Sequence, residues 1–355
     1  MSDPEERSRV TADGPAAVIV LAAGEGTRMR TSTPKMLNEV CGRAMLGHVV
    51  AAAREVNPQR LILVVSDLDG QVAGYARQHY PDAILVLQER NGSWGTGHAV
   101  RTAIEHVGTI NGTVVVLFSD TPMLRGATLA SLVEAHESAA AAVTVLTTTA
   151  PDPTGYGRIL RGDDGQVAGI VEEADATSEQ REVTEVSSGM FAFDGELLAD
   201  AVKRVPVAAA TGEEYLTEVP AILRADGHLV GSAFCADFDE VQGVNNQAQL
   251  AAARRVLNQR LLSQHMAAGV MVMDPASTWV DVGVQIEPGA RICPASQLEG
   301  HTAIGKGASI GPSSLLRDTV VGAGASVLQS VCESAVIEPG AVVGPFAHLR
   351  RVDPQ

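Results

Sequence analysis

The sequence is poor in cysteine and in positive charge, and it has no long apolar run. Its cysteines are scattered with no Cys-x-x-Cys pair, at Cys41, Cys235, Cys293 and Cys332, which argues against a zinc site and a disulfide framework. No stretch approaches the ~20 apolar residues of a membrane span. Lys and Arg number 26 against 42 Asp and Glu, a net charge of −16, which disfavours nucleic acid as a partner.

The N-terminal residues 1–14 are polar and lack the apolar segment of a secretory signal. We expect them to form a disordered lead-in and the protein to be soluble and cytoplasmic. A length of 355 residues predicts about two domains. Because the overall charge repels anions, any polyanionic ligand has to be held by a local group of cations.

The most informative stretch lies near the N-terminus and reads Leu21-Ala22-Ala23-Gly24-Glu25-Gly26-Thr27-Arg28-Met29, followed by Thr33-Pro34-Lys35. It comes directly after an apolar run at 16–20, which is typical of the first buried strand of a parallel sheet. Two glycines one residue apart let backbone N–H groups approach an anion, and Arg28 and Lys35 add positive charge. We interpret it as a phosphate-binding loop that is neither a Walker loop nor a dinucleotide fingerprint. Gly-x-Gly alone is weak evidence for phosphate binding, because it is also typical of an ordinary strand-to-helix turn.

The chain continues with alternating strand-like and helix-like segments. Buried strands are expected at 60–65, 83–88 and 113–118, and helices at 44–54, 97–107 and 127–139. This alternation predicts an α/β fold with a mostly parallel, Rossmann-like sheet. Shorter strands at 143–148, 158–160 and 167–171 would extend it. Ligands of such sheets bind beyond the carboxyl ends of the strands, so the segments after Leu21, Leu87 and Phe118 are the candidate site.

Two of these segments carry groups suited to a nucleotide. Asp120 follows a strand, and an unpaired carboxylate in the core would be costly, so we expect it to face the cleft as a magnesium ligand. The alternative is a turn cap before Thr121. Gly95-Thr96-Gly97 precedes a helix, where backbone N–H groups suit a phosphate or the carbonyl of a base. The alternative is again an ordinary cap.

Aliphatic residues repeat near the C-terminus at intervals of six. They are Val280, Ile286, Ile292, Leu298, Ile304, Ile310 and Leu316 and, after a slip, Val331, Ile337, Val343 and Leu349. Neither a helix nor a hairpin gives this spacing, and a β-helix does. Residues 246–268 are expected to form a connecting helical arm with Arg254, Arg255 and Arg260 on a solvated face. The expected division is thus a lead-in at 1–14, an α/β domain at 15–245, the arm at 246–268 and a short β-helix at 269–355.

The Leu-Ala-Ala-Gly-x-Gly-Thr-Arg-Met and Pro-Lys motif resembles that of sugar-1-phosphate nucleotidylyltransferases. Further matches at Gly95-Thr96-Gly97-His98 and Gly243-Val244-Asn245-Asn246 narrow the resemblance to the bacterial bifunctional N-acetylglucosamine-1-phosphate uridyltransferase and glucosamine-1-phosphate acetyltransferase family. It implies a left-handed β-helix. It also implies uridylyl transfer from UTP to an N-acetylhexosamine 1-phosphate, most simply N-acetylglucosamine 1-phosphate, with release of pyrophosphate.

The resemblance also gives a role to each matched residue. Catalytic roles fall to Arg28 and Lys35, and Mg²⁺ would be held by Asp120 and Asn245. The nucleotide would contact Leu21, Ala22, Ala23, Gly24, Gly26, Gln88, Gly95 and Thr96. The sugar would contact Gly157, Glu172, Ser187, Glu213, Tyr215 and Thr217. From the residues alone, Gly157 is more simply a turn glycine and Glu172 a solvated acid at a strand end.

The sequence departs from the family pattern in three places. Six residues separate Gln88 from Gly95 where four are usual, with Trp94 at a leucine position. Ser187 stands where the family has asparagine, and 207–211 lack asparagine. Two alternatives therefore stay open, namely the same reaction with another sugar, phosphate acceptor or nucleotide, and a regulatory protein that has lost catalysis.

The resemblance implies less for the C-terminal repeat. Most residues of the family's acetyltransferase site would lie beyond Gln355, and only Arg350 matches one of them. We therefore expect no acetyl transfer from this chain. A homotrimer assembled through the β-helix is a further expectation of the resemblance.

Overall fold

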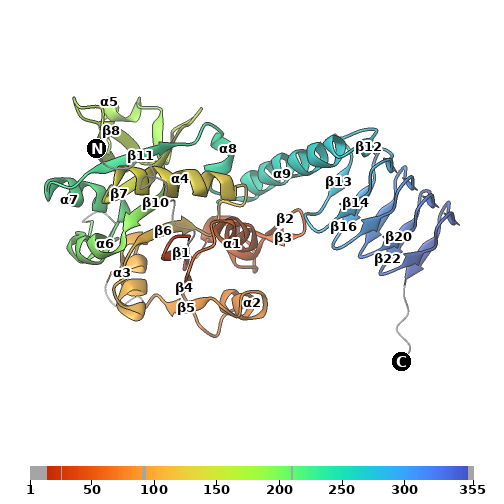
Figure 1. The fold of residues 1–355 in the computed structure, drawn as a ribbon, viewed down its shortest axis with the longest axis horizontal. Coiled ribbons are helices and arrows are strands. Elements are labelled where there is room, and N and C mark those ends of the chain that lie inside the picture. The colour runs from red at the N-terminus through yellow and green to blue at the C-terminus, as the bar shows by residue number, and fades with distance from the viewer. Residues whose placement is uncertain (1–13, 25, 90–92, 209–210, 351–355) are drawn as a thin grey trace, which may run out of the picture. The chain divides into compact units, whose positions relative to one another are not determined.

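The computed structural model describes residues 14–24, 26–89, 93–208 and 211–350. The expected lead-in at 1–14 lies outside this part of the chain, apart from Gly14. The chain forms two compact units, one of Met1–Asn38 with Met45–Asn246 and one of Glu39–Ala44 with Gln247–Gln355 (Figure 1). No helix within the described ranges is long and apolar enough to cross a membrane.

The first unit is built on a mixed sheet, which has nine strands among the described residues. Its main path runs β11-β7-β10-β6-β1-β4-β5, and β8 and β9 attach beside β10. The bounds are β1 Ala17–Ala22, β4 Leu61–Val65, β5 Ile84–Leu87, β6 Thr113–Phe118, β7 Val143–Thr149, β8 Arg158–Arg161, β9 Val167–Val171, β10 Glu185–Asp194 and β11 Val230–Phe234. Strands β6, β1, β4 and β5 are parallel, which confirms the predicted Rossmann-like core.

Helices cover both faces of this sheet because the buried strands are apolar on both sides. Along β1, Ile19 and Leu21 join one core with residues of α3, whereas Val18 and Val20 join the other with residues of α1. The first core also takes in α6 and α7, and the second α2 and α4. The bounds are α1 Met45–Glu55, α2 Gln71–His79, α3 Thr96–Val107, α4 Gly126–Ala139, α5 Ser178–Arg181, α6 Gly195–Ala201, α7 Val219–Ala225 and α8 Phe238–Val241. Short 3-10 turns are η2 Thr27–Met29, η3 Lys35–Leu37, η4 Val202–Arg204 and η5 Leu216–Glu218.

The second unit consists of a long helix, α9 Gln247–Ala267, a small hairpin and a β-helix. Three parallel sheets form the walls of the β-helix, in the orders β12-β15-β18-β21-β24, β13-β16-β19-β22-β25 and β14-β17-β20-β23. The bounds are β12 Met271–Val272, β13 Trp279–Val280, β14 Gln285–Ile286, β15 Arg291–Ile292, β16 Gln297–Glu299, β17 Ala303–Ile304, β18 Ser309–Ile310, β19 Leu315–Arg317, β20 Val320–Val321, β21 Ser326–Val327, β22 Val331–Glu333, β23 Val336–Ile337, β24 Val342–Val343 and β25 His348–Arg350. The six-residue repeat thus gives the β-helix that it predicts.

The inward positions of the β-helix correct one detail of the predicted repeat. Leu316 pairs with Cys332, which is fully buried, and Cys332 pairs with Leu349. The neighbouring Val331 is only half-buried and pairs with Leu315 and His348. The inward-facing residue of this coil is therefore Cys332, and the prediction of Val331 at that position was wrong. Eighteen positions separate the paired residues Leu298 and Leu316, whereas only sixteen separate Leu316 and Cys332. Because the coil is shorter there, a fixed interval of six no longer identifies the inward-facing residue.

The hairpin of β2 (Glu39–Val40) and β3 (Arg43–Ala44) belongs to the second unit, which the sequence did not indicate. The Arg254 guanidinium of α9 donates to the carbonyl of Glu39 at 2.9 Å, so this arginine is more than part of a solvated face. The Cys41 thiol donates to the carbonyl of Arg254. Burial, and then the nearby Asp281 carboxylate, raise the pKa of Cys41 to about 12, which keeps the thiol protonated and unreactive.

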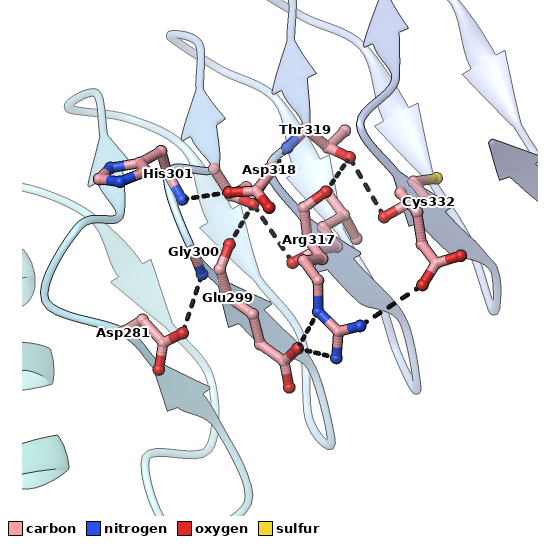
Figure 2. A network of polar contacts seen from close by, with 11 residues as sticks. Asp281, Glu299, Gly300, His301, Arg317, Asp318, Thr319 and Cys332 are labelled. Atoms are coloured by element: carbon pink, nitrogen blue, oxygen red, sulfur yellow. Dashed lines mark hydrogen bonds and ion pairs between the residues drawn. The ribbon is translucent and has the colours of Figure 1, made fainter. Parts of the chain in front are cut away.

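Polar side chains connect successive coils along one edge of the β-helix (Figure 2). The Arg317 guanidinium reaches the carboxylates of Glu299, at 2.6 Å, and of Glu333, at 3.5 Å. At the corner between coils, Gly300 N–H donates to the Asp281 carboxylate and His301 N–H donates to that of Asp318. These side chains satisfy backbone donors at corners where the strand ladder is interrupted. The ion pairs are exposed and contribute little stability.

Candidate active site

A cavity of about 470 Å³ lies in the first unit, at the carboxyl ends of β1, β5 and β6. The predicted catalytic and metal-binding residues line it, together with most of the predicted nucleotide contacts and one predicted sugar contact, Glu213. They are Leu21, Ala23, Gly24, Gly26, Arg28, Lys35, Gln88, Gly95, Thr96, Asp120, Glu213 and Asn245. Ala22 does not, because its side chain packs in the core that includes α1. Met36, Ala99, Phe118 and Ser119 also line the cavity, although we had predicted no role for them.

Four polar side chains in the cavity form one cluster. The Lys35 ammonium donates to the Asp120 carboxylate and, at 2.6 Å, to Oδ1 of Asn245. The Arg28 guanidinium donates to the same Asn245 oxygen at 2.8 Å. The Lys35 and Asp120 side chains are only 12% and 20% exposed, so their charges interact with little screening by solvent. Two cations and two oxygen ligands, distant in sequence, therefore meet at one place.

Backbone contacts hold this cluster in place. The N–H of Val244 donates to the carbonyl of Asp120 at 2.9 Å, and the N–H of Ser119 donates to that of Leu21 at 3.2 Å. These bonds join the segment after β6 to the loop that carries Asn245 and to the end of β1. Gly26 has a φ of +61°, a conformation that glycine adopts without strain, and its missing side chain leaves room for Lys35. Each charged group is thus positioned by a segment whose backbone is itself fixed.

The ligand chemistry at Asp120 and Asn245 suits a hard divalent cation. A carboxylate and an amide carbonyl offer oxygen, which Mg²⁺ prefers. Among the described residues no group of three or more His, Cys, Asp or Glu side chains has a metal-binding arrangement. Mg²⁺ commonly takes one or two protein ligands and completes its shell with waters and substrate phosphates. The two residues therefore fit a divalent cation that takes its remaining ligands from water or a substrate.

One side of the cavity is built by Gln88, Gly95 and Thr96 against the segment of Glu213 and Glu214. Gly95 has a φ of +114°, and a Cβ there would lie 2.5 Å from the carbonyl oxygen of Glu214. Thr96 Oγ1 accepts from the N–H of Leu216 at 3.0 Å. The N–H of Gly97 donates to the carbonyl of Glu214 at 2.8 Å. The N–H of Gly97 is therefore engaged within the fold, which leaves Gly95 and Thr96 as the predicted contacts of this segment.

Apart from Glu213, the residues predicted to contact the sugar form a second group outside the lining of the cavity. Ser187 N–H donates to the carbonyl of Gly157 at 2.8 Å, and Thr217 donates to the Glu172 carboxylate at 2.7 Å. The Tyr215 hydroxyl pairs with Thr211 at 2.8 Å. Burial, and then the charge of Glu172, raise the pKa of Glu213. Glu213 lines the cavity, so this interaction places the second group next to it.

Tyr156 is a residue whose position the sequence reasoning missed. Burial, and then the Asp120 carboxylate, raise the pKa of its phenol, while a hydrogen bond with the backbone of Gly243 lowers it. Its ring packs edge-on against that of Phe238, with the centroids 5.8 Å apart. Tyr156 thus connects the Gly157 segment with Asp120 and the Asn245 loop. In the sequence, only its place beside Gly155 and Gly157 indicated that Tyr156 could lie near the site.

Comparisons with known proteins indicate the family to which the chain belongs. The sequence profile of the MobA-like NTP transferase domain matches residues 18–186. The bifunctional protein GlmU of Thermobifida fusca is 54% identical over 334 residues, which is 93% of this chain and 69% of that protein. The protein of the same name from Streptomyces avermitilis is 52% identical over 339 residues, or 95% of this chain and 70% of that protein.

The chain belongs to the bifunctional GlmU family. A third GlmU, from Corynebacterium aurimucosum, is 47% identical over 94% of the chain. Together with the NTP transferase profile, these GlmU relatives confirm the resemblance found in the motifs and show that the chain is a sugar-1-phosphate uridylyltransferase. Nucleotidyltransferases of this family generally use a divalent metal, in agreement with the oxygen ligands at Asp120 and Asn245.

Proposed function

We propose that this enzyme transfers the uridylyl group of UTP to N-acetylglucosamine 1-phosphate, with Mg²⁺, and releases pyrophosphate. The observation that carries the proposal is the meeting of Arg28, Lys35, Asp120 and Asn245 at the carboxyl ends of the strands, within one cavity. Two cations beside two oxygen ligands are what a triphosphate with its metal requires.

In the proposed reaction an oxygen of the sugar phosphate attacks the α-phosphorus of UTP. A new phosphorus–oxygen bond forms, and the bond from the α-phosphorus to the bridging oxygen of pyrophosphate breaks. The attacking oxygen is already anionic, so no general base is needed, and catalysis consists of positioning and charge neutralisation. Arg28 and the loop of Gly24 and Gly26 would hold the triphosphate. Lys35 would meet the charge that grows as the bond to pyrophosphate breaks.

Asp120 and Asn245 are the residues that would hold the metal. When bound, Mg²⁺ supplies charge neutralisation and aligns the phosphates of the two substrates. Both oxygens accept hydrogen bonds from Lys35, so this lysine has to give up at least part of these contacts to reach a phosphate. The electrostatic attraction of the triphosphate favours that exchange.

The sugar would lie on the side of Gly157, Glu172, Glu213 and Tyr215. One observation favours a different acceptor as the second candidate. Ser187 Oγ already accepts from the N–H of Gly189 at 3.1 Å, and a hydroxyl offers fewer hydrogen bonds than the family's asparagine amide. A sugar without an N-acetyl group would need fewer polar partners there.

The direct test is pyrophosphate release by the purified chain, with UTP and a panel of sugar 1-phosphates that includes N-acetylglucosamine, glucosamine, galactose and glucose. We expect the highest kcat/KM with N-acetylglucosamine 1-phosphate and no release after chelation of the metal. A higher kcat/KM with a sugar that lacks the N-acetyl group would establish the second candidate. No release with any pair of substrates at saturating Mg²⁺ would contradict the proposed reaction.

A further inference from the structure

The amide nitrogen of Gln88 has two partners. It lies 2.9 Å from the carbonyl oxygen of Gly95 and 3.0 Å from Nδ1 of His98. A backbone carbonyl only accepts hydrogen bonds, so the atom that faces Gly95 has to be the nitrogen of the amide and not its oxygen. That nitrogen carries two hydrogens, one for each partner. It follows that Nδ1 of His98 accepts, and that the proton of the neutral imidazole is on Nε2.

This arrangement determines what Gln88 can offer to a ligand. With both hydrogens of its amide engaged, the side chain keeps one hydrogen-bonding atom, Oε1, for which no partner is found among the described residues. Gln88 lines the cavity that holds the charged cluster, whereas His98 lines a separate cavity behind it. The residue therefore presents an acceptor, and not a donor, to a base in the cavity.

We propose that His98 is a positioning residue that fixes the orientation of the Gln88 amide, so that the site selects a base whose edge donates a hydrogen bond. Uracil has such a donor at N3, whereas N3 of cytosine is an acceptor and would face Oε1 without a proton between them. A mismatched polar pair in a partly buried site costs more than the net gain of a matched one. This inference rests on the proposed function for the identity of the nucleotide, and on the two Gln88 contacts for the role of His98.

The surroundings of His98 keep it in the form that can accept. The residue is 8% exposed. Burial first, and then the positive charge of Arg101 one turn further along α3, lower its pKa, while the carboxylates of Glu214 and Glu105 raise it. Arg101 is itself paired with Glu214 at 2.8 Å. The other titratable groups lining the cavity of His98 are Glu89 and His106. The result is a neutral imidazole at pH 7.

The test compares two replacements of His98 with a matched control. In His98→Leu the amide of Gln88 loses one of its two anchors, and we expect the ratio of kcat/KM for UTP over CTP to fall about five- to tenfold. The loss should lie in KM, with kcat little changed, because the base is remote from the reacting phosphorus. His98→Asn keeps an acceptor near the position of Nδ1 and should restore most of the ratio. His106→Leu, on the same helix, should leave it at the wild-type value.

An unchanged ratio in a folded His98→Leu enzyme would overturn the proposal, as would an equal fall in the His106→Leu control. If His98→Leu does not fold, a measurement on the wild-type protein tests the proposal instead. In ¹⁵N NMR of histidine side chains at pH 7, we expect the Nε2–H tautomer for His98, and the Nδ1–H tautomer would overturn the proposal. The NMR readout needs no turnover. A wild-type enzyme inactive with UTP would thus refute the proposed function and leave the role of His98 to be judged separately.

Discussion

A Cβ placed on Gly26 would lie 2.2 Å from the Cβ of Lys35. The glycine of the phosphate-binding loop and the lysine of the Pro-Lys motif are thus in direct contact, although eight residues separate them. The φ of +61° at Gly26 would strain any other residue. The two parts of the motif therefore form one structural element, in which the position of the cation depends on the absence of a side chain.

Gly26→Ala should consequently impair both stability and catalysis. We expect the free energy of unfolding to fall by about 1–3 kcal/mol from the strained conformation and the overlap with Lys35, and kcat/KM to fall at least about tenfold as the ammonium is displaced. Gly24→Ala is the matched control, because a Cβ there meets nothing within 4 Å, and its unfolding energy should stay within about 0.5 kcal/mol of wild type. Equal destabilisation in urea unfolding would contradict the contact.

Asp120→Ala should remove the carboxylate proposed to hold the metal. We expect a loss of several kcal/mol of transition-state stabilisation, or roughly a hundredfold or more in kcat/KM, with a shift of the Mg²⁺ dependence to higher concentration. Asp82→Ala serves as a control, since this aspartate is 66% exposed and pairs with Arg54. Turnover by Asp120→Ala within a few fold of wild type at saturating Mg²⁺ would show that the ligand lies elsewhere.

Lys35→Ala is expected to lower kcat more than it weakens nucleotide binding. The ammonium is compact, and it meets charge that grows during the transfer. It donates hydrogen bonds to Asp120 and Asn245, so part of its attraction for UTP is offset by the loss of these contacts. Steady-state kinetics and calorimetry of UTP binding together measure the two effects. Equal losses in kcat and in affinity would reduce Lys35 to a binding residue.

His136 should make the stability of the first unit depend on pH. The residue is 4% exposed and its Nδ1 lies 3.2 Å from the Thr144 hydroxyl. Burial lowers its pKa, against a smaller raising effect of Asp194. A histidine whose folded pKa lies below its unfolded value of 6.5 contributes stability above pH 6.5 that is lost as the pH falls through the folded pKa. The contribution is about 1.4 kcal/mol for each pKa unit of difference.

Urea unfolding between pH 7.5 and 5 measures this effect. His136→Asn keeps a polar partner for Thr144 and removes the titration, so its stability should change less with pH than that of wild type. Identical pH profiles for the two proteins would contradict the assignment.

The absence of acetyl transfer also stays a prediction. We expect no thiol release from acetyl-CoA in the presence of glucosamine 1-phosphate, under conditions in which this 355-residue chain performs nucleotidyl transfer. Arg350, the one residue matched to that activity, lies on β25 beside Glu333 and is exposed. Thiol release above a control without enzyme would contradict the prediction, and its loss in Arg350→Ala would show that this arginine takes part.

The apolar pattern of the sequence predicted the parallel strands of the first unit, because such patterns are local. The strands near Val20, Val86 and Val116 are apolar runs, and their carboxyl ends meet at the cavity as parallel topology requires. Strand β10 was not predicted, because Ser187, Ser188 and Gly189 interrupt its apolar pattern. Its pairing with β6 and β7 is antiparallel, and the pairing with β7 shifts in register between Ser187 and Phe191. Such pairing is determined by distant partners, which a single sequence does not reveal.

The candidate site could be predicted only in part, because only some of its features depend on neighbouring residues in the sequence. The positions of Asp120 and Lys35 followed from strand ends and a motif, whereas their hydrogen bonds depend on a loop more than a hundred residues away. The use of the Gly97 N–H by Glu214 could not be foreseen, because nothing in the residues around Gly97 indicates which segment approaches it. The same holds for Tyr156, because Asp120, Phe238 and Gly243 around it are distant in the sequence.

The hairpin of Glu39–Ala44 has a consequence for how the second unit can be made. This unit is discontinuous, since 45–246 intervene between its two pieces. During synthesis the hairpin emerges early and must remain without α9 until the whole first unit has been translated. A fragment that starts at Gln247 would also lack the carbonyl of Glu39 that receives the Arg254 guanidinium. Separate expression of the β-helix therefore calls for a circularly permuted or two-piece design that restores those six residues.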